Sequence, residues 1–599
     1  MTMDRLSFKR FRTLLVVGSI TFPILFTLTL MHQHSIYDLV EGVSNINILA
    51  ARAQNATTNV LKEGRRNATV QVEEGKDQNV VDKMLGGKQQ ISSEEQAQTP
   101  TNADIGKAGS KNHSFEDEKN DSTLSTVGFA SVRLLDGLLV STFDEGSCIS
   151  RYQSYLFRKR SPHKPSVYLI SKLRKYEHLH RSCGPHTKSY DKIMGKSTKS
   201  SKSGAGEKCK YLVWTASNGL GNRMLTLVAA FLYAILTDRV LLVKFGDDMS
   251  DLFCEPFADS SWLLPRNFRY WKDQKHIKTH ESMLINKGYN AKEIFPSFLI
   301  LNLQHTHDGH NNFFHCDHCQ NLLQRVPVMI LWSDQYFVPS LFLIPSFRKD
   351  LSKMFPQKDT IFHHLGRYLF HPSNKAWELI SKFYQAHLAK ANEKIGLQIR
   401  VFNTHRASHQ TIINEIIACA LRHKLLPEID MEKSTTSLKN HATISKAVLV
   451  ASLYSEYGER LRNMYMRNTT GTGEVIRVSQ PSHEERQKSN DGMHNIKAWS
   501  EIYLLSLCDA LVTSPKSTFG YVAHGLGGLK PWILKRPYGE TVPEPPCQRA
   551  MSMEPCFHYP PKYECSVNRT IDFTSLVHHM EHCEDVPNGL RLINDNRKG

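Results

Sequence analysis

Apolar and polar residues along the middle of the chain follow a strand, turn, helix, strand pattern. A short apolar run at 211–215 precedes a turn with two glycines at 218–222. From Arg223 the apolar residues recur with helical spacing as far as Leu236, and a second apolar run covers 240–243. This pattern predicts a βαβ unit whose first turn offers free backbone N–H groups to an anion. A tight turn beside an ordinary surface arginine is an equally simple interpretation.

The second half of the chain repeats this alternation. We expect strands at 395–402, 447–453, 474–478, 510–514 and 531–534. Helices are expected at 409–423, 455–466, 496–509 and 517–528. Two such α/β units with a cleft between them suit a nucleotide-bound substrate.

Three polar positions in these units are candidates for chemistry. Asp334 follows the apolar run 327–333, where ligands lie in open α/β sheets, although a turn-capping role explains it equally well. Arg400 interrupts an apolar strand near its carboxyl end, so an anion must compensate its charge. That anion is an internal carboxylate or a diphosphate, whose geometry suits a forked donor. Ser517 opens the last helix as a phosphate cradle or merely as an N-cap.

The N-terminal region has a different pattern. Residues 13–31 carry no charge and follow several basic residues, which predicts an uncleaved transmembrane anchor with residues 1–12 in the cytoplasm. A cleaved signal peptide is the rival, but its apolar region is usually shorter. The segment 32–130 is polar with few aromatic residues, so we expect a disordered lumenal stem. The chain is then a single-pass type II membrane protein.

The cysteines and the glycosylation motifs agree with a lumenal location. The chain has 12 cysteines, all of which follow the anchor, as expected in an oxidising compartment. The motif for N-glycosylation occurs at Asn55, Asn67, Asn112, Asn120, Asn468 and Asn568. The run 315–319 has the spacing of half a zinc site, but no matching half follows, so disulfide bonding is favoured. The globular part contains no Asp-x-Asp pair, and we expect no metal.

A net charge of +17 suits an anionic partner, and 151–199 is a strongly basic tract. The tract is interpreted as a solvated face around a structured arm, with a shelf for an acidic or sugar-rich acceptor as the alternative. The anchor and the glycosylation motifs exclude a nucleic-acid binder.

Several longer runs resemble the plant α-1,2-fucosyltransferase family, which is typified by xyloglucan fucosyltransferase. They include GLGNRM (219–224), DLFCEPF (251–257), HHLGRYLFHP (363–372), QIRVF (398–402), STFGYVA (517–523) and AMSMEPCFH (550–558). The similarity begins near residue 135 and extends to the end of the chain. It implies a GT-B-like fold of two Rossmann-type lobes, after the anchor and stem. Residues 131–390 would form the acceptor-side lobe, 391–545 the GDP-fucose-side lobe and 546–599 a cysteine-containing extension.

The resemblance also implies an activity and roles for particular residues. The protein would be an inverting, metal-independent Golgi enzyme that transfers L-fucose from GDP-fucose to the 2-hydroxyl of a galactose on a cell-wall glycan. Its acceptor would be a galactose-terminated polysaccharide or proteoglycan, such as xyloglucan or arabinogalactan, and a homodimer is left open. By this likeness Arg400 binds the diphosphate and Asp334 lies near the acceptor hydroxyl. Ser517, Thr518 and Phe519, with His494, resemble the nucleotide-contacting motif. Gly221, Asn222 and Arg223 resemble the family's first loop and are expected to bind substrate.

One loop departs from the family pattern. After 398–402 the family continues with an acidic residue and a Gly-Pro pair, whereas this chain has N-T-H-R-A-S at 403–408. The difference implies altered acceptor choice or weakened activity. A catalytically weak or inactive carbohydrate-binding relative is therefore the alternative function.

Overall fold

The computed structural model describes most of the chain after residue 132. The predicted anchor and stem, the loop at 402–406 and every predicted glycosylation site except Asn468 lie outside the described residues. Within the described residues, no helix is both long enough and apolar enough to cross a membrane. The described ranges are 133–195, 208–268, 278–279, 296–306, 308–401, 407–434, 445–488, 490–561, 574 and 577–594.

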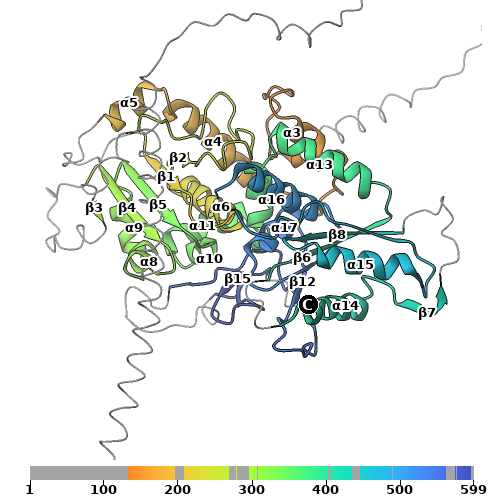
Figure 1. Ribbon diagram of the computed structural model, residues 1–599. Helices are drawn as coiled ribbons and strands as arrows, with labels where there is room; N and C mark the ends of the chain where they lie inside the picture. Colours follow the sequence, from red (N-terminus) through yellow and green to blue (C-terminus); the bar gives the residue numbers. More distant parts are fainter. Residues whose placement is uncertain are drawn as a thin grey trace, which may run out of the picture. The chain divides into compact units, whose positions relative to one another are not determined.

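The first half of the described chain forms a parallel sheet (Figure 1). Its strands are β1 (Tyr211–Thr215), β2 (Val240–Lys244), β3 (Lys278–Thr279), β4 (Phe298–Leu303) and β5 (Val328–Ser333), in the order β2-β1-β5-β4-β3. The predicted βαβ unit is confirmed, with α6 (Leu220–Leu236) between β1 and β2. The helix starts three residues before the predicted position because Gly219, with extended backbone, serves as its N-cap.

The second half forms another sheet, parallel except at one edge. Its order is β10-β8-β6-β11-β12-β13, and β13 pairs antiparallel with β12. The chain moves outward from β6 through β8 to β10 and then returns to the other side of β6. The strand order therefore reverses between β6 and β11, a topological switch point where ligands bind in open α/β sheets. The strands are β6 (Glu393–Ile399), β8 (Lys446–Ser452), β10 (Ile476–Ser479), β11 (Ala510–Thr513), β12 (Trp532–Leu534) and β13 (Cys547–Arg549).

The helices predicted for this half are confirmed, with ends shifted by a few residues. They are α14 (His409–Arg422), α15 (Glu456–Arg467), α16 (Gly492–Leu505) and α17 (Thr518–Gly527). The α16 helix starts earlier than predicted because Asp491 caps it, accepting hydrogen bonds from the N–H groups of Met493 and His494. The α17 helix ends where Gly528 adopts a left-handed conformation, φ 68°.

The remaining described helices surround the sheets, and the remaining strands form two small antiparallel pairs. The pairs are β7 (Ile429–Ser434) with β9 (Asn468–Thr470), and β14 (Met580–His582) with β15 (Leu590–Leu592). The helices are η1 (Leu135–Gly137), α3 (Ile149–Gln153), η2 (Ser154–Leu156), α4 (Val167–Cys183), α5 (Lys188–Met194), α8 (Asp308–Phe314), α9 (Asp317–Leu323), α10 (Val338–Leu341), α11 (Pro345–Met354), η5 (Lys358–Thr360), α12 (Ile361–Leu369) and α13 (Asn374–His387).

One hydrophobic core connects the elements around the two sheets. Helix α6 is buried along nearly its whole length and packs against α12 and α17. Phe231 of α6, Leu365 of α12, Trp499 of α16 and Leu526 of α17 belong to the same buried cluster. Because α16 and α17 come from the second sheet region and α6 from the first, this packing fixes the carboxyl ends of both sheets relative to each other.

Much of the basic tract 151–199 is folded, and several of its basic side chains contact other parts of the chain. Helices α4 and α5 lie within it, and Lys172 forms an ion pair with Asp350. Arg158 donates hydrogen bonds to Ser506. Arg151 is buried, donates to the carbonyl of Glu255 and packs over the ring of Phe143. These contacts favour the structured-arm interpretation of the tract.

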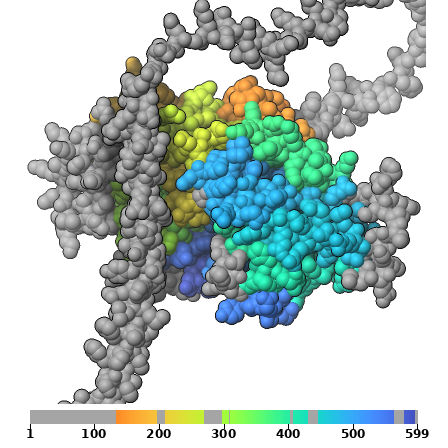
Figure 2. Space-filling view, viewed as in Figure 1, coloured from red at the N-terminus to blue at the C-terminus, as the bar shows by residue number. Residues whose placement is uncertain are grey.

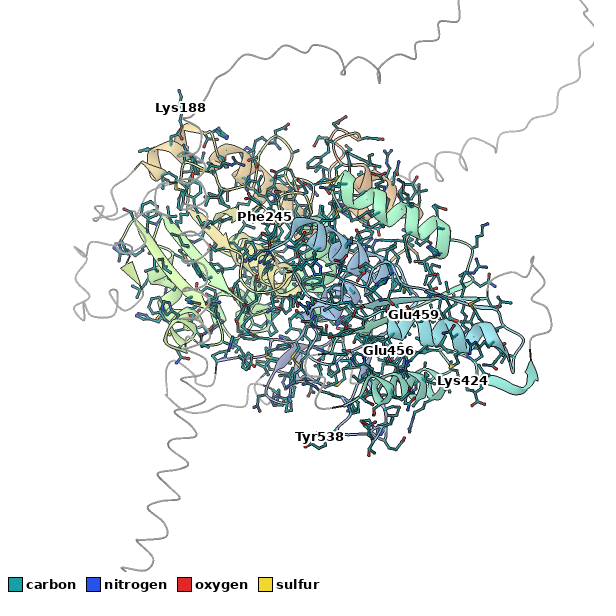
Figure 3. The ribbon with its side chains drawn as sticks, viewed as in Figure 1. Lys188, Phe245, Lys424, Glu456, Glu459 and Tyr538 are labelled. Atoms are coloured by element: carbon teal, nitrogen blue, oxygen red, sulfur yellow. A yellow bond between two sulfur atoms is a disulfide. The ribbon has the colours of Figure 1, made fainter. Side chains whose placement is uncertain are left out.

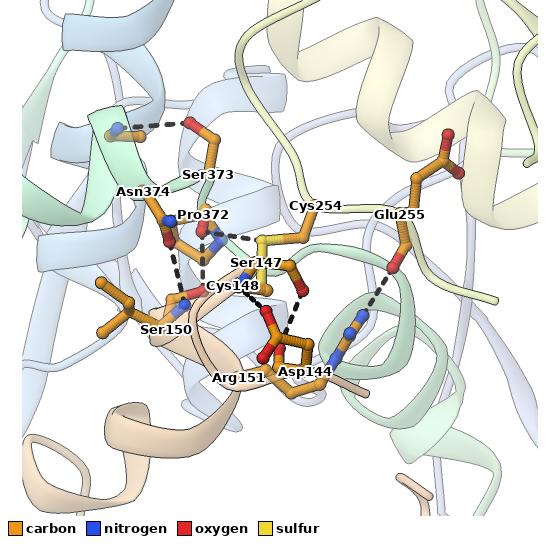
Figure 4. The surroundings of a disulfide bond; sticks show 12 residues. Asp144, Ser147, Cys148, Ser150, Arg151, Cys254, Glu255, Pro372, Ser373 and Asn374 are labelled. Atoms are coloured by element: carbon orange, nitrogen blue, oxygen red, sulfur yellow. Dashed lines mark hydrogen bonds between the residues drawn. A yellow bond between two sulfur atoms is a disulfide. The ribbon is translucent and has the colours of Figure 1, made fainter. Parts of the chain in front are cut away.

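Disulfide bonds fasten the described chain at several points. One joins Cys148 before α3 to Cys254, and beside it the hydroxyl of Ser150 donates a hydrogen bond to the carbonyl of Pro372 (Figure 4). The others among the described pairs are Cys183–Cys209, Cys419–Cys547 and Cys556–Cys583. In the run 315–319, Cys316 is disulfide-bonded as favoured from the sequence, whereas Cys319 is a free thiol.

Candidate active site

A pocket of about 360 Å³ lies at the carboxyl ends of the second sheet's strands. Gln398, Ile399 and Arg400 line it from the end of β6, and 451–453 line it from the end of β8. Across from them, residues at the start of α6 complete the wall. The pocket therefore occupies the switch point between β6 and β11. Its lining also includes Gly219, Leu220, Gly221, Asn222, Ser482, Glu484, Gln487, His494, Asn495, Lys497, Ala498, Glu501, Lys516, Ser517, Thr518, Phe519 and His558.

The N-termini of α6 and α17 meet at this pocket. A Cβ atom on Gly221 would lie 2.7 Å from the backbone nitrogen of Phe519 and 2.7 Å from the carbonyl carbon of Thr518. Only glycine permits that approach. The Thr518 hydroxyl donates a hydrogen bond of 2.6 Å to Asn222 Oδ1, which ties the two helix starts together. Two positive dipole ends and their free N–H groups therefore converge on one wall.

Arg400 lies directly after β6, whereas the sequence predicted that it interrupts the strand. The strand ends at Ile399, because the N–H of Arg400 leaves the sheet and donates to Ser514 Oγ at 2.9 Å. The guanidinium lines the pocket, where its Nη2 donates to Gln487 Oε1 at 2.6 Å. Burial lowers the pKa of Arg400, and Tyr454 opposes the shift. A half-buried guanidinium has the forked geometry that suits a phosphate.

The turn before α17 adds further donors. Ser517 caps α17, accepting a hydrogen bond from the N–H of Gly520, so the N-cap interpretation of this residue is correct. Lys516 lines the pocket with a left-handed backbone, φ 58°. Its N–H donates to Asp585 Oδ2 at 2.7 Å, which holds that conformation. The cap and the anion cradle are compatible, since the helix start still faces the pocket.

Two pocket-lining side chains carry polar atoms with no hydrogen-bond partner among the described residues. They are Gln398 Oε1 and His494 Nδ1, both buried. Burial also lowers the pKa of His494, which favours its neutral ring. Buried polar atoms normally have partners, so these two atoms are candidates for contact with a bound polar ligand.

Two of the predicted site residues do not line this pocket. Arg223 is buried, donates through Nε to the carbonyl of Asn218 at 2.7 Å and forms an ion pair with Asp248. Asp248 also accepts a hydrogen bond of 3.1 Å from Asn495, so the arginine secures the first turn to α16. Asp334 lies beyond β5 at the carboxyl end of the first sheet, and Asn218 Nδ2 donates to it at 3.3 Å. The structure therefore brings Gly221, Asn222, His494, Arg400, Ser517, Thr518 and Phe519 together and leaves Arg223 and Asp334 beside them.

Several residues that line the pocket were not predicted from the sequence. Among them are Gln398, Lys516, Glu501 and His558. Lys516 directly precedes Ser517, a predicted site residue, and His558 ends a run that carries the family likeness, so both positions had a signal. Glu501 is one residue in a helical pattern, and nothing in that pattern marks it.

Two further predicted sites can be placed. The side-chain amide of Asn468, at the start of β9, donates to the carbonyl of Met464 at 2.9 Å, and its glycosylation stays a prediction. Among the described residues, no group of three or more His, Cys, Asp or Glu side chains is arranged to hold a metal ion.

The fold and the pocket define the class: an α/β protein with a pocket at the carboxyl ends of parallel strands, lined by Arg400 and by the starts of two helices. The family model described as xyloglucan fucosyltransferase matches residues 101–566. The galactoside 2-alpha-L-fucosyltransferase of Pisum sativum is 52% identical over 475 residues, covering 78% of this chain and 84% of that protein. Its counterpart of the same description in Arabidopsis thaliana is 52% identical over 471 residues, covering 77% and 83%.

A solved structure agrees with these sequence matches. A mutant of Arabidopsis thaliana FUT1 in complex with GDP matches with a TM-score of 0.71 and 51% identity, covering 77% of this chain and 100% of that one. The chain belongs to the xyloglucan fucosyltransferase family, and it is a fucosyltransferase. The resemblance found in the sequence is confirmed.

Proposed function

We propose that this enzyme transfers L-fucose from GDP-fucose, in α-1,2 linkage, to a terminal galactose of a cell-wall glycan such as xyloglucan or arabinogalactan. The observation that carries the proposal is the pocket in which Arg400 faces the meeting helix starts of α6 and α17. The descriptions of the two relatives name a galactoside and a 2-alpha linkage, and the related structure holds GDP. They support the same donor and linkage here.

The pocket suits a nucleoside diphosphate through its charge and its shape. Arg400 and Lys516 supply positive charge, and the N-terminus of α17 supplies free N–H groups. The diphosphate of GDP-fucose would lie between them. Gln398 and His494, whose buried atoms lack partners in the described chain, are available to other polar groups of the donor.

The same groups promote the departure of GDP. As the bond between fucose and phosphate breaks, negative charge grows on the leaving phosphate, and fixed donors aimed at it lower the barrier. We propose that Arg400 and the α17 helix start provide this stabilisation without a metal ion. The acceptor oxygen then attacks the fucose C1 from the opposite face, so the reaction inverts the anomeric configuration.

The fold and the location belong to the same proposal. We propose a GT-B-like enzyme with an acceptor-side and a donor-side Rossmann-type lobe, anchored in the Golgi membrane with its catalytic part in the lumen. The two parallel sheets and the disulfides support this interpretation, since disulfides persist in oxidising compartments. The uncharged segment 13–31 would be the anchor.

The test is transfer of radiolabelled fucose from GDP-fucose by Arg400→Ala and Arg400→Lys. We expect both to lower kcat by about 100-fold or more, since even lysine loses the forked geometry. Arg477→Lys is a matched control, because Arg477 is an exposed arginine of the same sheet that does not line the pocket. Thermal unfolding checks the folding of each variant. Normal turnover in either Arg400 variant would refute the proposed role.

The same assay decides the acceptor and the metal question. Xyloglucan, arabinogalactan and galactose-free xyloglucan are supplied as separate acceptors, with and without EDTA. We expect incorporation only into galactose-terminated chains and an unchanged rate with EDTA. A rate that falls with EDTA and returns with a divalent ion would contradict the metal-independent mechanism.

A further inference from the structure

A hydrogen-bonded histidine–aspartate pair lies beside the pocket. Asp334 follows β5 and His305 follows β4, and these neighbouring parallel strands end at the same edge of the first sheet. His305 Nδ1 lies 2.6 Å from Asp334 Oδ2. The carboxyl side chain is only 3% exposed, whereas the imidazole is 44% exposed. The buried carboxylate of Asp334 therefore fixes the position of the His305 imidazole, which reaches solvent.

The oxygens of Asp334 are already occupied. Oδ1 accepts hydrogen bonds from the N–H of His305 at 3.1 Å and from Gln335 Nε2 at 2.8 Å. Oδ2 accepts from Asn218 Nδ2 at 3.3 Å in addition to the imidazole. An acceptor hydroxyl would have to displace one of these donors to reach the carboxylate. Asp334 is consequently suited to orient a neighbour and poorly suited to take a proton from substrate.

The imidazole of His305, unlike the carboxylate, has a nitrogen that can accept a proton from substrate. An ionised carboxylate only accepts hydrogen bonds, so Nδ1 of His305 carries the hydrogen of the shared bond. In the neutral ring, Nε2 then has the free lone pair. Nε2 makes no hydrogen bond within the described part of the chain, and its ring is half exposed. A carboxylate that fixes the tautomer of a solvent-facing imidazole is the arrangement of a general base.

Two chain segments connect this pair directly to the wall of the pocket. Asn218, which donates to Asp334, is followed by the pocket residue Gly219. Tyr559 stacks on the imidazole of His305 with ring centroids 5.1 Å apart, and it follows the pocket residue His558. The pair thus lies next to the pocket, on the side of the first sheet. Among the described residues, the titratable groups that face His305 are Asp334 and Tyr559, with His558 behind the tyrosine.

We propose that His305 is the catalytic base of the transfer reaction and that Asp334 is its positioning residue. The inference rests on the proposed function and adds the proton acceptor to it. The acceptor hydroxyl oxygen forms a bond to fucose C1, while the bond from C1 to the β-phosphate oxygen breaks. The electron pair of that bond leaves with GDP, and the hydroxyl proton passes to Nε2 of His305.

The experiment measures kcat/KM against pH for the wild type, His305→Gln and the exposed control His178→Gln on α4. In the wild type, we expect the rate to fall on the acidic side, because a general base must be unprotonated to accept a proton. His305→Gln should lose about 10²- to 10⁴-fold in kcat and lose this acidic limb, with GDP affinity within about twofold of the wild type. Imidazole added to His305→Ala should restore part of the rate.

Each possible result either supports or overturns the assignment of His305 as the catalytic base. Wild-type kcat in His305→Gln, an unchanged acidic limb, or no rescue by imidazole would overturn the assignment. Loss of GDP binding together with transfer would also overturn it, because the histidine would then be structural. A wild-type enzyme that transfers no fucose to galactose acceptors overturns the proposed function instead, and the two failures are therefore distinguishable.

Discussion

Glu501 shows how burial controls a single ionisable group in the pocket. It lies on α16, lines the pocket and is almost fully buried. Burial raises its pKa to about 8, although the hydroxyl and the N–H of Ser482 favour the charged form. At neutral pH the carboxyl is therefore predominantly uncharged, which suits a pocket that binds anions.

This shift predicts a pH-dependent stability. In the unfolded chain the Glu pKa is about 4.3, so between about pH 4.5 and 8 the folded state binds more protons than the unfolded state. Stability from this group is full below that window and decreases as pH rises through it, by at most about 1.4 kcal/mol per pH unit. Glu501→Gln should lack this pH-dependent component. The free energy of unfolding of the variant should therefore rise relative to that of the wild type between about pH 5 and 8.

The measurement is urea unfolding of the wild type and the variant across that range. Glu459→Gln is the control, since Glu459 is exposed on α15 (Figure 3). Parallel pH profiles for Glu501→Gln and the wild type would contradict the predicted ionisation.

Two arginines illustrate what the sequence could and could not predict at this scale. Arg400 and Arg223 are both predicted to bind substrate. Arg400 directly follows β6, and Arg223 lies in the first turn of α6, after β1. Arg400 lines the pocket, whereas Arg223 is bound to Asp248. The carboxylate that decides this is 25 residues away along the chain, and only the packing of the turn against α16 brings it close.

At the scale of elements, the site depends on how closely α6 and α17 approach. Gly221 lies where the two helix starts touch, and the space of its missing side chain is filled by backbone atoms of Thr518 and Phe519. Gly219, two residues earlier, has the end of the Gln487 side chain nearby, and a Cβ atom on this glycine would lie 3.1 Å from the amide nitrogen of Gln487. The two glycines therefore form a natural pair for comparison.

Gly221→Ala should separate the helix starts and weaken GDP binding by about tenfold or more. The added methyl meets backbone that cannot rotate away, and overpacking of this kind costs about 1–3 kcal/mol. Gly219→Ala should change affinity much less, because a flexible amide can yield. Isothermal titration with GDP and thermal unfolding measure both effects. Equal affinities for the two variants would show that the helix contact does not shape the site.

Sequence patterns predicted the regular α/β elements well and the short ones poorly. The strands β1, β2, β5, β8 and β11 and the helices of the second sheet follow from long apolar or helical runs. The predicted strand at 395–402 continued past Ile399 because Val401 and Phe402 are apolar. The edge strand β13 has three residues and exists because β12 is beside it, so its own residues carry no strand signal.

At the scale of the molecule, residues 546–599 contribute to both sheet regions. Strand β13 extends the second sheet, and Figure 2 shows C-terminal residues, in dark blue, at the surface in the lower part of the view. Buried Glu554 accepts hydrogen bonds from the hydroxyl of Tyr336 and the N–H of Phe362. Asp585 accepts from the N–H of Lys516 and the hydroxyl of Tyr521. Through Asp585, the C-terminal segment thus holds the turn that carries the pocket residue Lys516.

Asp585 offers the sharpest test of that support. It holds Lys516 in a left-handed conformation, which costs about 1–3 kcal/mol for a residue with a side chain unless its surroundings fix it. Asp585→Ala should free the turn before α17 and lower GDP affinity by about tenfold, even though Asp585 itself does not line the pocket. Asp585→Asn keeps one acceptor oxygen for the same N–H and should lie between this variant and the wild type. Titration with GDP ranks the three proteins, and thermal unfolding verifies that each is folded. If affinity is the same in all three, the turn before α17 is held by its own sequence, and Asp585 has no part in binding the donor.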